Sequence, residues 1–451
     1  MFERTILSQL QGWQIRSDRK PLIIRGARQV GKTTVVKQFS TRFDQFIYLN
    51  LELPEDRKPF EEFQNMDILL QRLFLLKNLS LAKKELTLIF IDEIQEVTQA
   101  LQQLRFFYEQ VPEVSVIAAG SLLESLFEPE ISFPVGRVEY LAIYPVSFPE
   151  FLNATGEHGA FEQIQKIPMP DFAVSRLMHL FRTYCLVGGM PEVVAHYSEN
   201  KDLTALGRIF ESLLTSYIDD VEKYARNKSH TEYLRHAIRA SFAEAGKRIK
   251  FQGFGHSAYR SREMGEALRT LEKALLIHLI FPQTSPVLPL QPDYGKSPRL
   301  QFLDTGMLNY FLGIQADILG TSELNSIYHG TMIEHMVGQE LLASQYSTIH
   351  DLQFWVREKN TASAEVDYLF AFEGKLVPIE VKSGPGGKLK SLHQFIELAP
   401  HELAVRFYSG PVQITTHTTP KGKGFYLLNL PYFLVSQIKF YLTWFEKEIK
   451  K

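Results

Sequence analysis

The 451-residue sequence contains one cysteine, Cys185. A single cysteine excludes a disulfide framework and a cysteine-built zinc site, and it fits a reducing compartment best. Apolar runs such as residues 86–91 are far shorter than the about 20 residues that a membrane-spanning helix needs. The amino terminus shows no apolar signal-peptide core. These absences predict a soluble cytoplasmic protein without membrane contact.

An excess of charge of one sign is also absent. Lys plus Arg number 49 and Asp plus Glu number 51, which gives a formal net charge of −2. This balance excludes a globally basic nucleic-acid coat protein and an acidic tail protein, so any basic surface must be local. Hydrophobic residues make up 45% and charged residues 22%, which are ordinary values for globular proteins. The length predicts roughly three domains.

The first 150 residues alternate strand-like and helix-like patterns. Apolar runs at residues 22–25, 86–91 and 114–119 are separated by segments with apolar residues at helical spacing. Near-continuous hydrophobicity is typical of parallel strands that are covered on both faces. The predicted fold class is therefore α/β, with a parallel sheet and helices on both of its faces.

The rest of the chain divides into a helical part and a second α/β unit. Residues 181–281 are mostly helical by periodicity, and a proline-rich wing, loop or linker follows at residues 282–298. Beyond it, a helix at 331–342, a strand pair at 365–372 and 376–382, and a helix from Leu389 predict a separate unit. We expect domains at residues 1–200, 201–320 and 321–451.

Residues 26–33 read GARQVGKT and match the phosphate-loop pattern G-x-x-x-x-G-K-[ST] between an apolar strand and a helix. Glycines allow backbone N–H groups to turn inward around phosphates, Lys32 reaches the β and γ phosphates, and the Thr33 hydroxyl binds Mg²⁺. The start of the helix adds positive potential. The pattern predicts an ATP site whose nucleotide contacts are Gly26, Arg28, Gln29, Val30, Gly31, Lys32, Thr33 and Thr34.

An acidic pair, Asp92 and Glu93, ends the buried strand at residues 86–91. Asp92 is expected to hold the Mg²⁺ shell, and Glu93 to polarise the attacking water as general base. The next strand ends at Gly120 and is followed by Ser121. Ser121 either lies between the acidic pair and the γ phosphate or caps the following helix.

These three motifs resemble those of AAA-type P-loop ATPases. With FPVGRV at residues 133–138 and YPVSFPEFL at 144–152, the chain more narrowly resembles one prokaryotic family. Its members join an AAA-type module to a C-terminal domain of unknown function that is similar to restriction-endonuclease folds. The resemblance covers nearly the whole chain.

The resemblance implies two further nucleotide contacts. GGMP at residues 188–191 is similar to the lid motif of signal-transduction ATPases, in which the proline, here Pro191, touches adenine; an ordinary turn is the alternative. Arg137 follows a glycine, so it is either an arginine finger that reaches across a subunit boundary in a homo-oligomer or a surface arginine in a salt bridge.

Residues 221–273 contain twelve Lys or Arg and six acidic residues. The helices here, followed by a proline-rich turn, resemble a winged-helix module, with residues 257–277 as the recognition helix and its entry turn. Such a module would dock nucleic-acid phosphates. The alternative is a lid or an interface whose charged face is merely solvated.

Asp367, Glu380 and Lys382 form a D…E-x-K pattern in the C-terminal unit. A turn at residues 373–374 places Asp367 directly opposite Glu380, with their Cβ atoms about 4.5–5.5 Å apart. Lys382 shares that face, while Val366, Tyr368, Ile379 and Val381 take the other. Two opposed carboxylates favour a cation between them, so we expect Mg²⁺ or Mn²⁺, with Lys382 polarising a water or phosphate.

This unit resembles the PD-(D/E)xK nuclease superfamily, which implies Glu334 on the preceding helix as a further acidic residue. The proline of the superfamily motif is missing before Asp367, where Glu365 and Val366 stand. That departure leaves cleavage in doubt, and the alternative is a solvated strand face on which Lys382 pairs with Glu380. A protein-docking module without catalytic activity is the matching alternative for the domain.

Two functions follow from these predictions. The first is a Mg²⁺-dependent ATPase whose hydrolysis of ATP drives action on nucleic acid through a nuclease-like C-terminal domain. The second is an ATP-dependent signalling or regulatory switch that binds a protein partner through that domain. DNA stimulation of the ATPase distinguishes them, because only the first function requires it.

Overall fold

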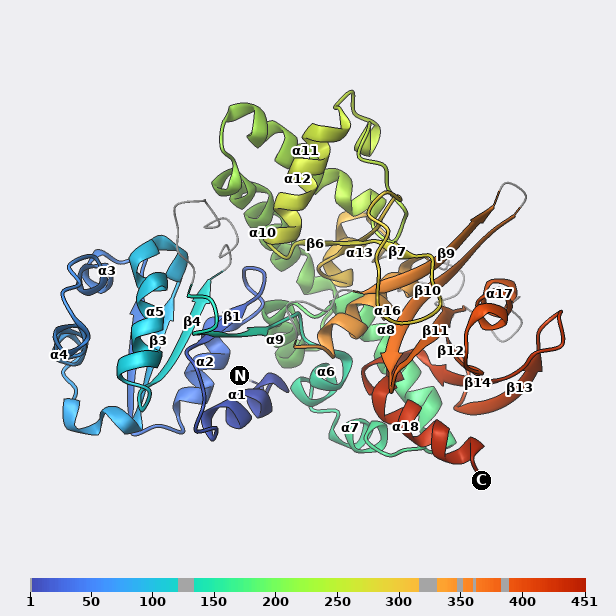
Figure 1. Ribbon diagram of the computed structural model, residues 1–451, viewed down its shortest axis with the longest axis horizontal. Coiled ribbons are helices and arrows are strands. Elements are labelled where there is room, and N and C mark those ends of the chain that lie inside the picture. Colours follow the sequence, from blue (N-terminus) through green and yellow to red (C-terminus); the bar gives the residue numbers. More distant parts are fainter. Residues whose placement is uncertain (1, 121–133, 316–330, 347–351, 360–361, 383–388) are drawn as a thin grey trace.

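The computed structural model describes residues 2–451 except 121–133, 316–330, 347–351, 360–361 and 383–388. An N-terminal five-stranded sheet, a group of helices and a seven-stranded C-terminal sheet follow one another across Figure 1, and helices α8 and α9 lie between the two sheets. None of the described helices is long and apolar enough to cross a membrane.

The N-terminal sheet is parallel throughout and has the strand order β2-β3-β4-β1-β5. Its strands are β1 (Leu22–Arg25), β2 (Gln45–Asn50), β3 (Thr87–Asp92), β4 (Ser115–Gly120) and β5 (Glu139–Ala142). Strand β4 therefore lies between the strand that precedes the phosphate loop and the strand that ends in the acidic pair.

Helices cover both faces of this sheet, as predicted. Ile24 and Phe90 face the side of α1 (Ile6–Gln14) and α2 (Lys32–Ser40). Ile23 and Ile89, one residue earlier in each strand, pack in a separate core. That second core contains residues of α4 (Met66–Leu76), α5 (Thr98–Gln110) and α3 (Pro54–Glu61). Alternate side chains of a strand point to opposite faces, so apolar residues at every position give one core on each side.

The middle of the chain is helical. Its helices are α6 (Phe148–Ala154), α7 (His158–Ile164), α8 (Val174–Val187), α9 (Pro191–Asn200), α10 (Gly207–Asp220), α11 (Lys228–Glu244), α12 (Ser261–Lys273) and α13 (Thr305–Phe311). The segment predicted as a recognition helix is α12, which ends at Lys273 because Ile277 begins strand β6. Strands β6 (Ile277–Ile280) and β8 (Arg299–Phe302) form an antiparallel pair.

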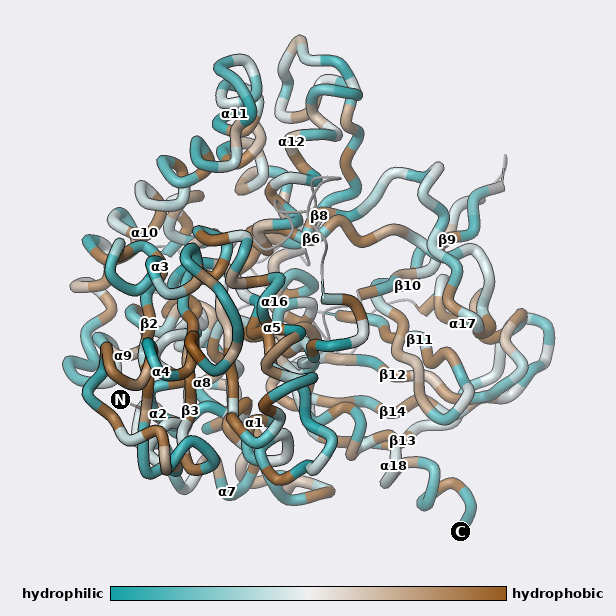
Figure 2. The backbone as a smooth tube through the Cα atoms, turned by 60° about the vertical axis from the view of Figure 1, so that its left-hand side comes forward, coloured by the Kyte–Doolittle hydropathy of each residue, from teal (hydrophilic) through white to brown (hydrophobic). Residues whose placement is uncertain are grey.

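The C-terminal sheet has the strand order β13-β14-β12-β11-β10-β9-β7. Its elements after residue 330 are α16 (Thr331–Ala343), β9 (Gln353–Lys359), β10 (Ala362–Phe372), β11 (Lys375–Val381), α17 (Lys390–Leu398), β12 (Leu403–Tyr408), β13 (Gln413–Thr418), β14 (Gly424–Pro431) and α18 (Ile438–Ile449). In Figure 2, brown hydrophobic stretches occur along strands of both sheets.

The proline-rich stretch belongs partly to this C-terminal sheet. Strand β7 (Pro282–Gln283) pairs in parallel with β9 at the sheet edge, where a proline is tolerated. Leu288 and Leu290 pack against the core beneath α17. The stretch therefore closes one side of the C-terminal unit, while the expected domain boundary at residue 321 stays a prediction.

The predicted hairpin register is present for the pairs from Tyr368 opposite Ile379 to Phe372 opposite Lys375. The prediction that Val366 and Tyr368 lie on the same face of the hairpin is wrong. The register of β10 against β9 shifts between Val366 and Leu369, and Val366 packs beside Leu369, away from Tyr368. A bulge inserts one extra residue, so the inside–outside alternation restarts after it.

One continuous core joins all three parts of the chain. It includes residues of the N-terminal sheet, helix α8 and the C-terminal helix α18. At its centre, the ring of Phe148 lies 5.1 Å from that of Phe181 and 6.3 Å from that of Phe433. Because apolar burial scales with contact area, this shared core makes independent motion of the parts costly.

Candidate functional site

The phosphate loop connects β1 to α2. A Cβ atom on Gly26 would lie 2.6 Å from the carbonyl oxygen of Ile143, so only glycine fits there. Gly31 precedes α2 with a φ of 96°, and Gln29 has a φ of 61°. Left-handed residues between right-handed ones turn successive N–H groups toward one concavity, which is an anion-binding geometry.

Lys32 lies buried in the first turn of α2. Its Nζ donates hydrogen bonds to the carbonyl oxygens of Gly26 at 2.9 Å and Ala27 at 2.8 Å. Burial lowers the pKa of the Lys32 ammonium to about 8, against the opposing influence of the Glu93 and Asp92 carboxylates. Phosphate oxygens arriving in the loop would supply a stronger partner for this cation than neutral carbonyls do.

Thr33 and Asp92 meet at one point. The Thr33 hydroxyl donates to Asp92 Oδ2 at 2.7 Å, and the Glu93 N–H donates to Asp92 Oδ1 at 3.1 Å. Burial raises the pKa of Asp92, while the hydrogen bond from Thr33 works in the opposite direction. A hydroxyl and a carboxylate in contact are hard oxygen ligands of the kind that Mg²⁺ favours, so the pair fits the metal ion of Mg-ATP.

Glu93 follows β3 in a left-handed conformation, with a φ of 52°. Its Oε2 accepts a hydrogen bond from Gln95 Nε2 at 2.5 Å. Strained backbone of this kind is concentrated at functional sites. The side chain lines the cavity described next, which is where a general base that activates water must lie.

A cavity of about 590 Å³ extends from the phosphate loop along α2. Its volume is in the usual range for small-molecule sites. The structure brings together around it most of the predicted ATP-site residues, namely Arg28, Gln29, Gly31, Lys32, Thr33, Thr34, Glu93 and Pro191. Lining residues that the sequence reasoning missed come from the N-terminal segment, α2 and α9, namely Phe2, Arg4, Val35, Gln38, Glu192 and Ala195.

Pro191 begins α9 and lies over the phosphate loop, with its Cγ 3.5 Å from where a Cβ on Gly31 would be. The two glycines before it contact a buried carboxylate from another part of the chain. The Gly189 N–H donates to Asp304 Oδ2 at 2.6 Å, and a Cβ on Gly188 would lie 2.4 Å from Asp304 Oδ1. The turn that positions Pro191 therefore depends on Asp304.

Two residues of α10 contact Arg28 of the phosphate loop. Its Nη1 lies 2.6 Å from Asp220 Oδ2, and its carbonyl oxygen accepts a hydrogen bond from the Tyr217 hydroxyl at 2.5 Å. The carbonyl oxygen of Val30, which does not line the cavity, accepts a hydrogen bond from Arg4 Nη1 at 3.2 Å.

Besides Gly26, Val30 and Asp92, which belong to the site without lining the cavity, two predicted residues are not placed there. Ser121 lies outside the described residues. Arg137 is half-exposed, and its Nε donates to Glu109 Oε1 at 2.7 Å. Within this one chain Arg137 thus makes the surface salt bridge that was its alternative reading, and a role in a neighbouring subunit stays a prediction.

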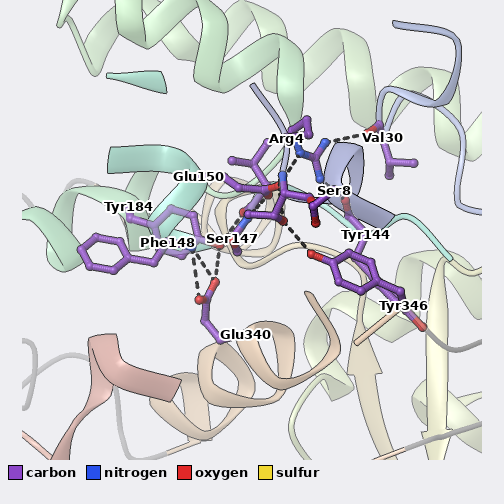
Figure 3. Close-up of polar contacts among 12 residues, drawn as sticks. Arg4, Ser8, Val30, Tyr144, Ser147, Phe148, Glu150, Tyr184, Glu340 and Tyr346 are labelled. Carbon is purple, nitrogen blue, oxygen red and sulfur yellow. Dashed lines mark hydrogen bonds and ion pairs between the residues drawn. The ribbon is translucent and has the colours of Figure 1, made fainter. Parts of the chain in front are cut away.

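Figure 3 shows how the N-terminal segment is attached beside the loop. Buried Arg4 donates from Nη2 to the carbonyl oxygen of Tyr144 at 2.8 Å and lies 3.0 Å from Glu150 Oε1. The same oxygen accepts hydrogen bonds from the Thr5 N–H at 2.7 Å and the Thr5 hydroxyl at 2.8 Å. The Thr5 hydroxyl in turn accepts one from Tyr346 at 2.8 Å.

The C-terminal acidic residues do approach one another, but their partners lie within the chain. Lys382 Nζ lies 2.6 Å from Glu380 Oε1, and Asp367 Oδ2 accepts the Val381 N–H at 2.7 Å. Burial, followed by the charge of Asp367, raises the pKa values of Glu334 and Glu380 well above their ordinary range. Burial likewise raises the pKa of Asp367. Protons thus compensate part of the charge.

A buried arginine that the sequence reasoning missed completes this cluster. Arg299 from β8 lies against the rings of Phe354 and Tyr368, at 4.7 and 5.5 Å from their centroids. It pairs with Glu365 and lies 4.0 Å from Glu334 Oε2. Among the described residues, no group of three or more His, Cys, Asp or Glu could hold a metal ion. The predicted second Mg²⁺ or Mn²⁺ site therefore lacks support.

The basic stretch at 221–273 is partly neutralised. Five of its twelve cations form ion pairs with carboxylates, namely Lys223 with Asp220, Arg226 with Glu266, Arg235 with Glu222, Lys247 with Glu244, and Arg248 with Glu358. Paired charges at a surface contribute little to a long-range field. Three of these carboxylates, Glu222, Glu244 and Glu266, already count among the acidic residues of the stretch, so the pairs with Asp220 and Glu358 lower its positive excess by two charges.

Three segments of the chain match models of protein families. Residues 18–152 match an AAA domain, residues 178–318 match a domain of unknown function (DUF8612), and residues 329–433 match another domain of unknown function (DUF4143). An uncharacterized protein of Methanocaldococcus jannaschii is 26% identical over 367 residues, which are 78% of this chain and 72% of that protein.

Two solved structures are similar in part. The Walker-type ATPase of Pyrococcus abyssi aligns with a TM-score of 0.44 and 16% identity over 69% of this chain and 96% of that chain. A signal-transduction ATPase with numerous domains and a tetratricopeptide-repeat sensor, from Pyrococcus horikoshii, aligns with a TM-score of 0.28 and 12% identity, over 74% of this chain and 48% of that one. The predicted AAA-type unit is confirmed by the family match, whereas the winged-helix and restriction-endonuclease likenesses stay predictions.

Proposed function

We propose that the chain binds Mg-ATP in the cavity beside α2 and hydrolyses it. The observation that carries this proposal is the convergence of three groups on one cavity. They are the buried ammonium of Lys32, the Thr33–Asp92 contact at 2.7 Å, and Glu93 in its left-handed turn. Mg²⁺ bound by Thr33 and Asp92 would neutralise the charge of the phosphates, and Glu93 would accept the proton of the attacking water.

Two substitutions separate nucleotide binding from turnover. Lys32→Ala removes a ground-state phosphate contact and is expected to abolish ATP binding in a titration. Glu93→Gln keeps the shape of the cavity and is expected to retain binding while phosphate release stops. Lys58→Ala, at a lysine 70% exposed on α3, and Glu61→Gln, at an exposed glutamate, are the matched controls. Wild-type phosphate release by Glu93→Gln would contradict the assigned role.

For the work coupled to hydrolysis, we favour the regulatory switch over action on nucleic acid. The observations are the internal partners of the C-terminal acids, the ion pairs of the basic stretch, and the Asp304–Gly189 contact. That contact ties the lid turn to the following unit, so a change in nucleotide occupancy has a direct physical route into the rest of the chain. In this proposal the nuclease-like unit is a catalytically inactive docking module for a protein.

The rate of ATP hydrolysis with and without DNA tests this choice. The switch predicts the same rate with single-stranded, double-stranded and branched DNA. It also predicts that none of these DNAs is cleaved in Mg²⁺ or Mn²⁺. Stimulation of the wild type by any of them, lost in a charge-reversed Arg239→Glu variant but kept in Lys58→Glu, would favour the nucleic-acid function instead.

A further inference from the structure

The cavity beside α2 has a second half that the phosphate motif does not explain. Beyond the loop, it runs past Val35 to Gln38, one and a half turns along the helix. The six steps along the helix from Lys32 to Gln38 rise about 9 Å. A triphosphate held by the loop would leave this half for the nucleoside, and Phe2, Pro191 and Ala195 are apolar residues among those that line the cavity.

Phe2 belongs to a segment that is fixed in place from several directions. Two residues later, Arg4 is 6% exposed and bonds to the Val30 carbonyl of the phosphate loop itself. Glu150, 4% exposed, faces both Arg4 and Thr5. Figure 3 shows Arg4 extended between Glu150 and Val30. A chain advances at most about 3.6 Å per residue, so Phe2 is confined to the neighbourhood of the loop.

The ring of Phe2 is half-buried against the apolar core in this region and still lines the cavity. A flat apolar ring at the nucleoside end of a phosphate site is suited to the face of a base, because stacking tolerates any base and needs no hydrogen bond. The segment that carries it precedes the residues that match the AAA domain.

We propose that Phe2 contacts the base of the bound nucleotide, an inference that rests on the proposed ATP site. Phe2 then contributes affinity only for ligands that carry a base. Arg4 fixes the segment before the ligand arrives, so little ordering entropy opposes binding.

Equilibrium titration of the full chain with Mg-ATP and with inorganic tripolyphosphate tests this inference. Stacking on an aromatic side chain is worth roughly one factor of ten in affinity. Phe2→Ala should lose about tenfold for ATP and stay within about twofold of wild type for tripolyphosphate. Phe2→Trp should restore ATP binding. Phe172→Ala, at an aromatic residue 78% exposed and away from the lining of the cavity, is the control.

The outcomes separate the two proposals. Unchanged ATP affinity in Phe2→Ala overturns the base contact while leaving ATP binding intact, provided that Lys32→Ala still abolishes binding. Equal losses for ATP and tripolyphosphate also overturn it, since they would mean a damaged loop. A wild-type protein that binds tripolyphosphate but not ATP, or neither, overturns the proposed ATPase itself.

Discussion

Glu340 on α16 offers the sharpest test of how the C-terminal unit is joined to the nucleotide unit. Its carboxylate is 1% exposed. It accepts the Phe148 N–H at 3.1 and 3.2 Å and the Tyr184 hydroxyl at 2.7 Å. Burial raises the pKa of Glu340 from 4.5 to about 7, despite the hydrogen bond from Tyr184. The substitution Glu340→Gln keeps the shape of the side chain and removes the carboxyl group that titrates.

The direction of the pH effect follows from proton linkage. Between pH 4.5 and 7 the folded chain holds a proton on Glu340 that the unfolded chain has lost, so stability falls as pH rises through this window. A shift from 4.5 to about 7 corresponds to about 3 kcal/mol, at about 1.4 kcal/mol per unit. This stabilisation is fully present below pH 4.5 and is lost above pH 7.

Urea unfolding of the full chain at pH 5 and pH 8 measures the effect. Relative to wild type, the free energy of unfolding of Glu340→Gln should rise by about 2.5 kcal/mol between pH 5 and pH 8, because part of the window lies below pH 5. Glu211→Gln, at an exposed position of α10, should show no such change. If the two proteins differ in free energy of unfolding by the same amount at pH 5 and pH 8, the reasoning is refuted.

Three further predictions concern the two candidate sites. The Lys32 ammonium of the free site has a pKa of about 8, so ATP affinity should fall by up to about tenfold per pH unit above pH 8. ATP titrations at a series of pH values should show no such fall in Lys32→Arg. If Arg137 acts in a neighbouring subunit, inactive Arg137→Ala and Glu93→Gln proteins should regain ATPase activity when mixed; no recovery at any mixing ratio would leave Arg137 with its surface salt bridge. Thermal unfolding of the full chain should respond equally to Mn²⁺ in wild type and Asp367→Asn, because Asp367 already accepts a backbone N–H; a Mn²⁺-dependent rise in Tm in wild type alone would restore the metal site.

Local patterns predicted local structure well. The spacing of the phosphate loop located Gly31, Lys32 and Thr33, because a loop that binds phosphate through its own backbone is encoded by consecutive residues. The hairpin register followed from Glu373 and Gly374, whose positive φ angles of 43° and 75° suit a two-residue turn.

Features that depend on contacts between residues far apart in the sequence were not predicted. Phe2 and Ala195 reach the cavity only through tertiary packing, and no spacing in the sequence connects them. Arg299 compensates Glu365, 66 positions away in the chain, so a local charge count at the D…E-x-K pattern misses it. The bulge near Val366 depends on pairing with β9 and cannot be read from β10 and β11 alone.

The two-residue strand β7 limits how the chain can be divided. A fragment that begins at residue 321 would lose the strand paired with β9 and the Leu288 and Leu290 side chains from its core. It would also lose the cation of Arg299, and an unpaired strand edge promotes association between molecules. Such a fragment is expected to aggregate, whereas one that begins near Ala274 keeps these elements. Exchange of this unit between proteins, in the laboratory or in evolution, therefore has to carry β6, β7 and β8 along with it.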